Sequence, residues 1–293
     1  MNSVRAAGVT LAVAVLVAAC GSSAGSTGAP PAASSGPLAP GSVGPAASSE
    51  TAADAVATYR TYLETNTDLL VQRTKAFTDA VIANKLTEAR DLYAPAREPY
   101  EAIEPVAESF GDLDPEIDAR ENDVAAGAAW TGFHRIEKAL WAQNSTVGMA
   151  PIARRLMTDV TTLQGLVKTV ELDPATIANG AVGLLNEVSS SKITGEEDRY
   201  SHTDLYDFDA NVAGSQAAFN AVRPLVVPYS PTLATTIDQH FAAVLDALQP
   251  FQKGSGYVPF TDLTTAQTQN LSTLIDALAD PLSQVAAIVV AAN

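Results

Sequence analysis

Apolar residues recur at helical spacing through most of the chain after residue 52. Within residues 53–83 the large apolar side chains lie on or near one stripe of a helix: Val56, Tyr59, Leu63, Leu70, Phe77 and Val81. No hairpin dipeptide stands between alternating apolar runs, and long stretches are rich in Ala, Leu, Glu and Gln. The pattern therefore predicts an all-α protein.

Capping residues and helix breakers divide this pattern into elements. Helices are expected over about 53–83, 87–110, 124–142, 145–170, 174–191, 203–222, 231–248 and 263–291. An irregular acidic connection is expected at 111–122, with Ser145 and Asp173-Pro174 as helix starts, a break at Gly195 and a kink at Pro281. Pro95, Pro99 and Pro105 each remove a hydrogen bond from the second helix, and the resulting breaks are expected to shape a site beside its glutamates.

A faint repeat relates the two halves of the chain. Ile103-Glu104-Pro105, Phe110 and Ile117-Asp118 are echoed after 119 or 120 residues by Val222-Arg223-Pro224, Tyr229 and Ile237-Asp238. Two related four-helix bundles would explain the repeat, and chance alignment of helical sequence is the alternative. Arg223 replaces Glu104, so only the first half keeps an anionic cluster if the two halves share a backbone.

The N-terminus has the features of an export signal. Arg5 precedes an apolar run, residues 6–17, that is too short to span a bilayer as a mature helix. The run ends in Val17-Ala18-Ala19-Cys20, a sequence that a lipoprotein signal peptidase accepts, and Cys20 is the only cysteine. We therefore expect lipid attachment at Cys20 and a location on the extracytoplasmic side of the cell membrane; an ordinary signal peptide with an incidental cysteine is the alternative.

Composition separates this region from the rest of the chain. Residues 21–49 are almost wholly Gly, Ser, Ala and Pro without charge, which is typical of a flexible tether. The predicted divisions are a signal peptide at 1–19, a tether at 20–50 and a helical metal-binding domain at 51–293. No second segment of transmembrane length is expected, and residues 285–292 are expected to pack as the last core helix.

The domain is strongly acidic. Beyond Ser49 the chain carries all 33 acidic residues and 16 basic ones, a formal charge of −17. Nucleic acids and anionic surfaces are therefore unfavourable partners, whereas cations are favoured.

One short motif suggests metal binding. In Gly132-Phe133-His134-Arg135-Ile136-Glu137, the imidazole of His134 and the carboxylate of Glu137 lie one helical turn apart and can bind the same cation. The alternative is a polar residue packed beside Trp130 and Trp141.

Four flanking segments accompany this motif in the order of a known family. They are Tyr93-Ala94-Pro95-Ala96-Arg97, Tyr100-Glu101-Ala102-Ile103-Glu104-Pro105, Ile117-Asp118-Ala119-Arg120-Glu121-Asn122-Asp123 and Ile193-Thr194-Gly195-Glu196-Glu197-Asp198-Arg199-Tyr200-Ser201. Together they resemble the imelysin-like (M75) family over roughly residues 55–290. More narrowly, the chain resembles the lipoproteins of EfeUOB-type iron-uptake systems that lack an N-terminal cupredoxin domain.

The resemblance implies a fold of two packed four-helix bundles and a set of metal ligands. The ligands are Glu104, Asp118, His134 and Glu137, with Glu197 preferred to Glu196 as a further carboxylate. Glu101 and Glu121 are nearby candidates. His202 is expected to be solvated, with a place in the cleft as the alternative, and His240 is expected to be structural.

One imidazole with several carboxylates and no sulfur suits iron, and zinc, manganese and copper also accept such ligands. Crowded carboxylates without a cation repel one another and have raised pKa values, which a bound cation relieves.

Three functions compete at this point. The first is a lipid-anchored iron-binding protein; the resemblance alone adds an iron permease and a haem peroxidase-like protein as partners. The second is a metallopeptidase, the label of the wider family, but the chain has no HExxH motif and no separate general base, so we expect no enzyme. The third is a non-catalytic polysaccharide-binding protein, which the charge of −17 disfavours. Neither a phosphate-binding P-loop nor a GxSxG motif is present.

Overall fold

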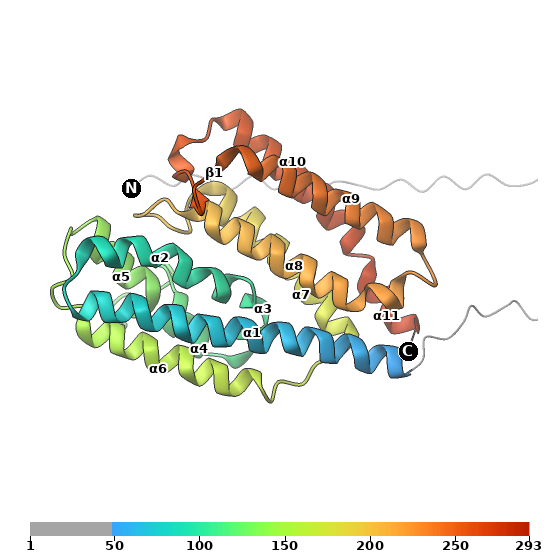
Figure 1. The fold of residues 1–293 in the computed structure, drawn as a ribbon, viewed down its shortest axis with the longest axis horizontal. Coiled ribbons are helices and arrows are strands. Elements are labelled where there is room, and N and C mark those ends of the chain that lie inside the picture. The colour runs from blue at the N-terminus through green and yellow to red at the C-terminus, as the bar shows by residue number, and fades with distance from the viewer. Residues whose placement is uncertain (1–48, 293) are drawn as a thin grey trace, which may run out of the picture. The chain divides into compact units, whose positions relative to one another are not determined.

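The computed structural model describes residues 49–292, and these form an almost entirely helical body (Figure 1). The α-helices are α1 (Ser49–Ile82), α2 (Leu86–Glu101), α3 (Glu104–Ala107), α4 (Leu113–Asp118), α5 (Gly132–Trp141), α6 (Ala150–Val167), α7 (Pro174–Ser190), α8 (Asp204–Val226), α9 (Pro231–Leu248), α10 (Thr265–Leu282) and α11 (Val285–Ala292). Single 3₁₀ turns occur at η1 (Glu108–Phe110), η2 (Lys192–Thr194), η3 (Gln249–Phe251) and η4 (Phe260–Asp262). The only strands in this part of the chain, β1 (Gln252–Lys253) and β2 (Gly256–Tyr257), form a small antiparallel hairpin. The all-α prediction is confirmed; the predicted signal peptide, Cys20 and most of the tether lie outside the described residues.

The helices form two bundles that share one long interface. Helices α1, α2, α5 and α6 pack together, and α7, α8, α9, α10 and α11 form the second group. Helix α8 also packs against α1 and α2, so it joins the two groups along their length (Figure 1). A continuous core of fully buried side chains runs through both bundles, from Leu63 and Phe77 in α1 to Phe219 in α8 and Ile275 in α10.

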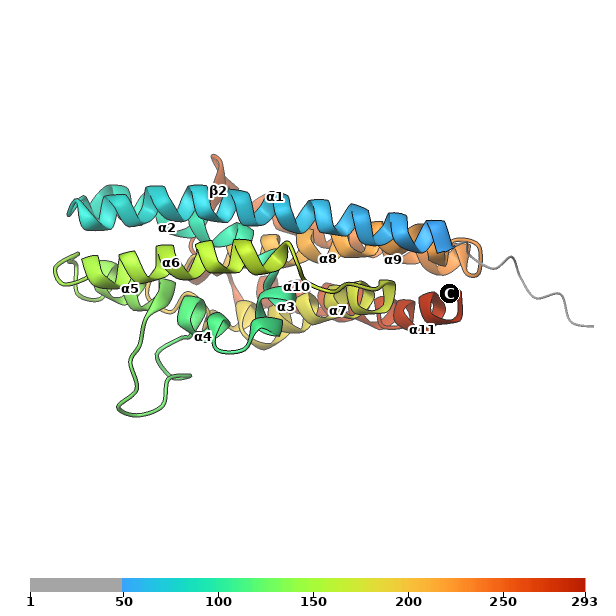
Figure 2. The same cartoon turned by 90° about the horizontal axis from the view of Figure 1, so that it is seen from below.

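Short elements fill the connection between α2 and α5. Helices α3 and α4 lie on the side away from α1, where α3 packs against α7 and α4 packs against α5 and α6 (Figure 2). Pro95 and Pro99 lie inside α2, which ends at Glu101, and Pro105 is in the first turn of α3. The break expected near these prolines therefore falls at Ala102 and Ile103, between two glutamates.

Several predicted boundaries are wrong for local reasons. The expected helix over 124–142 begins only at Gly132, and the connection before it contains α4. Ser145 is not a helix cap, because α6 starts five residues later without a side-chain cap. Asp173 does cap α7, since its side chain accepts from the Thr176 amide.

The two halves differ where the repeat places Glu104 and Arg223. Helix α8 continues through Pro224 to Val226, whereas α2 has ended before Glu104. Arg223 forms a salt bridge of 2.7 Å with Asp238, at the position that the repeat equates with Asp118. The second half thus holds a neutral ion pair where the first half holds two carboxylates.

One stretch near the C-terminus is long and apolar enough to cross a membrane by length and composition alone, residues 265–291. The expectation that no second segment reaches this length is therefore wrong. Only 28% of its most apolar window is buried, and in α10 the buried positions form one stripe of Leu271, Ile275, Leu278 and Leu282. Such a stripe is typical of a bundle helix that packs on its neighbours, here α7 and α9.

Gly132 determines where the histidine helix starts. Its φ is +83°, and a Cβ at this position would lie 2.1 Å from the Ile117 carbonyl oxygen. The start of α5 thus packs directly on the backbone of α4, which carries Asp118. Gly127 has a similar φ of +84°, but a Cβ added there would meet no atom within 4 Å, so this glycine offers a matched control.

We predict that Gly132→Ala lowers the free energy of unfolding by more than about 2 kcal/mol, because it adds a backbone clash to the strain of a positive φ. Gly127→Ala should lose only about 1 kcal/mol, since it adds the strain alone. Urea unfolding of both variants measures the difference. Equal losses would show that α5 does not depend on this contact.

Candidate metal centre

His134 lies buried in the first turns of α5, with different partners on its two ring nitrogens. On one side, Nε2 lies 3.6 Å from Asp118 Oδ1 and 3.4 Å from Glu197 Oε1. Nε2 makes no hydrogen bond within the described part of the chain. These three side chains each offer a ligand atom within 4.8 Å of the others, so they can hold one ion.

The other nitrogen faces Glu137. Nδ1 lies 3.1 Å from Glu137 Oε2 and 3.3 Å from the hydroxyl of Tyr93, which itself donates to Asp198 at 2.8 Å. Because the Tyr93 proton goes to Asp198, the tyrosine oxygen can only accept from the ring. This network favours a proton on Nδ1 and leaves Nε2 directed at Asp118 and Glu197.

Glu137 is also fixed by the backbone of a distant segment. Its Oε1 accepts from the amides of Tyr200 and Ser201 at 2.9 and 2.8 Å and from the Ser201 hydroxyl at 2.9 Å. A carboxylate with one oxygen on three donors and the other on His134 orients the ring. His134, Glu137 and Asp198 form a second possible group of ligands, but His134 Nδ1 and Glu137 already contact each other and Asp198 accepts from Tyr93.

Asp118 and Glu197 also line an acidic cavity of about 290 Å³. Glu104, Glu108, Asp114 and Glu187 also line this cavity. Three of the five predicted ligands, Glu104, Asp118 and Glu197, therefore share it, while Glu137 contacts the other nitrogen of His134.

Two fully buried cations lie among these carboxylates, and the sequence analysis assigned them no role. The Arg97 guanidinium contacts Asp118 and Glu101 and lies 3.4 Å from Glu197. The Lys192 ammonium lies 3.2 Å from Glu101 and 3.5 Å from both Glu104 and Glu197. Arg97 and Glu101 are four residues apart in α2, a spacing that predicts an ion pair; nothing local indicates that Lys192 is buried.

The charges of the site follow from these contacts. Burial raises the pKa of Asp118, but Arg97 and His134 outweigh it and hold that pKa below its usual value. Burial likewise raises the pKa of Glu197, but Lys192, His134 and Arg97 hold it well below its usual range. Both carboxylates are therefore ionised and available as ligands.

The imidazole is charged when no ion is bound. Burial and Arg97 lower the pKa of His134, but Asp118 and Glu137 outweigh them and hold it well above 6.5. A metal ion at Nε2 must therefore displace a proton.

Other buried acids have raised pKa values. Burial raises the pKa of Glu104 well above its usual value, against the opposing effect of Lys192. Burial and Asp198 raise the pKa of Asp207 well above its usual value and that of Asp204 to about 7. Asp204 Oδ1 accepts from the amides of Glu197 and Asp198 at 3.2 Å, which fixes the segment that carries Glu197.

The remaining candidates lie elsewhere. Glu196 is 61% exposed and pairs with Arg199, so the structure directs only Glu197 into the cavity. Glu121 is on the surface, held by Lys138 and the Tyr200 hydroxyl, and Glu101 is buried against Arg97 and Lys192. His202 and His240 are half-buried, and the cluster includes neither.

The alternative partners for His134 are engaged in other contacts. Trp130 donates its indole N–H to the Ala119 carbonyl at 2.7 Å, and the Trp141 ring packs edge-on against Tyr93 with centroids 5.3 Å apart.

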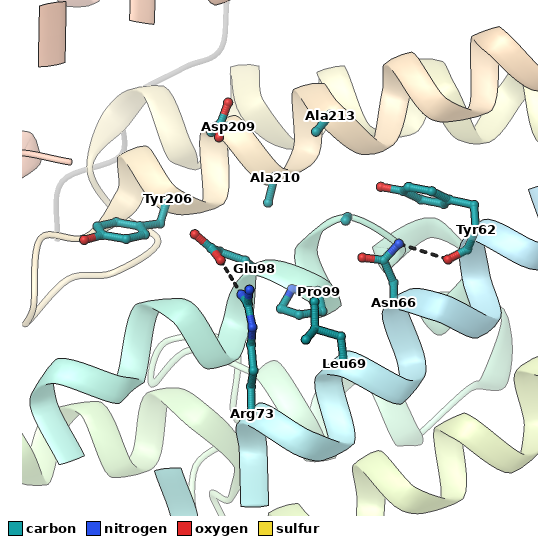
Figure 3. Close-up of a pocket in the computed structure, with 11 residues that line it drawn as sticks. Tyr62, Asn66, Leu69, Arg73, Glu98, Pro99, Tyr206, Asp209, Ala210 and Ala213 are labelled. Carbon is teal, nitrogen blue, oxygen red and sulfur yellow. Dashed lines mark hydrogen bonds and ion pairs between the residues drawn. The ribbon is translucent and has the colours of Figure 1, made fainter. Parts of the chain in front are cut away.

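A second cavity, of about 230 Å³, lies between α1, α2 and α8 (Figure 3). Glu98 and Asp209 both line it, but Arg73 pairs with Glu98 at 2.5 Å. It shares no lining residue with the acidic cavity and includes no histidine. The chemistry of a metal site is therefore concentrated around His134.

The sequence is also similar to that of known proteins. The sequence profile of the imelysin family, peptidase M75, matches residues 55–285. The chain belongs to the imelysin family. The match covers every residue of the His134 cluster and all helices of the two bundles except α11 and the first turns of α1.

Individual members of the imelysin family are also similar. The chain is 46% identical over 233 residues to the iron uptake system component EfeO of Escherichia coli K12, and equally to the proteins of that name from Shigella flexneri and Shigella sonnei. Each alignment covers 78% of this chain and 62% of the relative, so the chain spans less than two thirds of the length of these relatives.

Proposed function

We propose that this imelysin-family protein binds iron outside the cytoplasm as a component of an iron-uptake system. One observation carries the proposal: a buried imidazole nitrogen without a hydrogen bond faces two ionised carboxylates at the wall of an acidic cavity. The EfeO relatives are iron uptake system components, which supports iron as the cargo. Zn²⁺, Cu²⁺ and Mn²⁺ accept the same ligand types, so competition between ions must establish the preference.

In this proposal the ligands, the residue that orients the imidazole and the cavity each contribute differently to metal binding. Asp118, Glu197 and His134 Nε2 contact the ion, and Glu104 joins them when it leaves Lys192. Glu137 holds the imidazole through Nδ1, although the sequence analysis made it a direct ligand. The cavity concentrates cations at this point because its lining is rich in carboxylates.

The anchor and the partners extend the proposal beyond the described residues. Lipid attachment at Cys20 and the tether would hold the domain at the outer face of a membrane. An iron permease and a haem peroxidase-like protein are the partners that the family resemblance suggests.

We predict that His134→Ala weakens iron binding about 100-fold or more, and that Glu137→Gln weakens it about 10- to 100-fold by loosening the ring. His202→Ala is the matched control and should bind as the wild type does. Anaerobic calorimetric titration with Fe(II), and competition with Fe(III), Zn(II) and Cu(II), gives the affinities, while circular dichroism checks that each variant is helical.

The same titration has an expected pH dependence. Because the pKa of His134 is raised above 6.5, protons compete with the ion already near neutral pH, and affinity should fall steadily as pH falls from 8 to 6. His134→Ala should lose much of this dependence. Iron binding by His134→Ala equal to that of the wild type would refute the assignment of the site.

We also predict that the mature protein starts at Cys20 and fractionates with membranes. Cys20→Ala should give unprocessed or released protein, whereas Ser22→Ala should behave as the wild type. Fractionation and intact mass are the measurements, and identical behaviour of Cys20→Ala and wild type would exclude the lipid anchor.

Peptidase activity is not expected, because Glu137 is bound on both oxygens and the carboxylates beside Nε2, Asp118 and Glu197, are taken up as ligands of the ion. Metal-loaded protein incubated with a broad peptide library should give no cleavage by mass spectrometry. Cleavage that is lost in Glu137→Ala but kept in the exposed variant Glu196→Ala would make a metallopeptidase the better interpretation.

A further inference from the structure

Lys192 is one of the two fully buried cations beside the acidic cavity. Its side chain is wholly buried at the start of η2, and its ammonium lies 3.2 to 3.9 Å from four carboxylates: Glu101, Glu104, Glu187 and Glu197. Burial lowers the pKa of Lys192, but Glu101, Glu104, Glu197 and Asp207 outweigh it and hold that pKa well above its usual value, so the side chain stays charged.

Lys192 and the candidate ion share one carboxylate. Glu197 directs Oε1 to His134 Nε2 and Oε2 to the half-buried Arg120 at 3.1 Å and to Lys192 at 3.5 Å, so an ion at Nε2 would lie one carboxylate away from the ammonium. Glu104 also gives its Oε2 to Lys192 at 3.5 Å. A fixed positive charge therefore adjoins the place where a metal cation would bind.

The physical effect of such a charge depends on the charge of the ion. Repulsion between the ammonium and the ion grows in proportion to the ionic charge, so it disfavours a trivalent ion more than a divalent one. Burial strengthens the effect because little water screens it. The same ammonium offsets repulsion among the carboxylates when no metal is bound.

We infer that Lys192 determines the ionic charge that the site selects, by favouring divalent over trivalent metal. This inference rests on the proposed function, since it concerns the same site. Arg97 also carries charge here, but it packs over the rings of Tyr93 and Phe133 and contacts both Asp118 and Glu101. Lys192 is thus the residue whose charge can be removed with the least disturbance of the core.

The test compares two ions across matched variants. Lys192→Met removes the charge and keeps the length of the side chain, Lys192→Arg keeps the charge, and Lys85→Met removes an exposed lysine paired with Glu88. The probes are Fe(II) under anaerobic conditions and Ga(III), a trivalent ion without redox chemistry. Affinities are measured by competition with citrate.

In Lys192→Met the ratio of Ga(III) to Fe(II) affinity should rise by about tenfold or more. The substitution removes a repulsive unit charge a few ångströms from the ion, and the trivalent ion gains more from this loss because its own charge is larger. The ratio should stay near the wild-type value in Lys192→Arg and Lys85→Met. An unchanged ratio in Lys192→Met, or an equal fall of both affinities, would overturn the inference. A wild type that binds neither ion would instead refute the proposed function.

Lys192→Met alone leaves Glu101 buried without its nearest ammonium, which can prevent folding. A second pair of variants keeps the test usable in that case. Glu101→Gln is therefore combined with Lys192→Met, which removes both members of the closest pair and leaves the net charge of the site unchanged. Adding Lys192→Met to Glu101→Gln should raise the Ga(III) to Fe(II) ratio by about tenfold. A ratio that does not move in this background also overturns the inference.

The melting temperature of the metal-free protein gives an independent readout. Lys192→Met should melt below the wild type without metal and recover on addition of either ion, because a bound cation replaces the missing charge. Destabilisation that metal does not relieve, together with an unchanged ratio, would show that Lys192 is only structural.

Discussion

The architecture around His134 depends on one electrostatic constraint: carboxylates removed from water must be neutralised. Glu101, Asp118, Glu197 and their neighbours are buried where ionised groups are costly without partners. Arg97 and Lys192 provide charge inside the protein, and burial raises the pKa values of Asp204 and Asp207, which favours their protonated forms. The balance leaves Asp118 and Glu197 ionised at the cavity wall, which is the state that a metal ligand requires.

The backbone holds the charged side chains of the site in these positions. The end of α2 delivers Arg97 and Glu101, and the break after it turns Glu104 toward the cavity. The segment 195–203 delivers Glu197 and holds Glu137 through two amides. Ring orientation, ligand spacing and cavity shape are therefore set by the same few hydrogen bonds, and the site is largely organised before an ion arrives.

Sequence analysis predicted the helical class, most helix positions and the family from local pattern and motif order. It also named residues that the fold brings to one place, His134 with Asp118, Glu197 and Glu104. It misplaced the start of α5 because this depends on Gly132 against the backbone of α4, a tertiary contact. It treated Glu137 as a direct ligand because helical spacing shows that two side chains share a face, not which ring nitrogen each one meets. The burial of Lys192 could not be predicted from local sequence pattern, because the carboxylates that surround its ammonium come from segments far apart in the chain.

The bonds between Glu137 and the Tyr200 and Ser201 amides join residues more than 60 positions apart. Glu137 belongs to the first bundle, whereas the amides belong to the segment that enters the second. A chain whose second half has not yet been synthesised therefore has no oriented imidazole and no complete cavity. Any ion is acquired where folding finishes, and a chain moved across a membrane in extended form would arrive empty. The choice of metal would then be made from the ions available in the destination compartment, not from those at the place of synthesis.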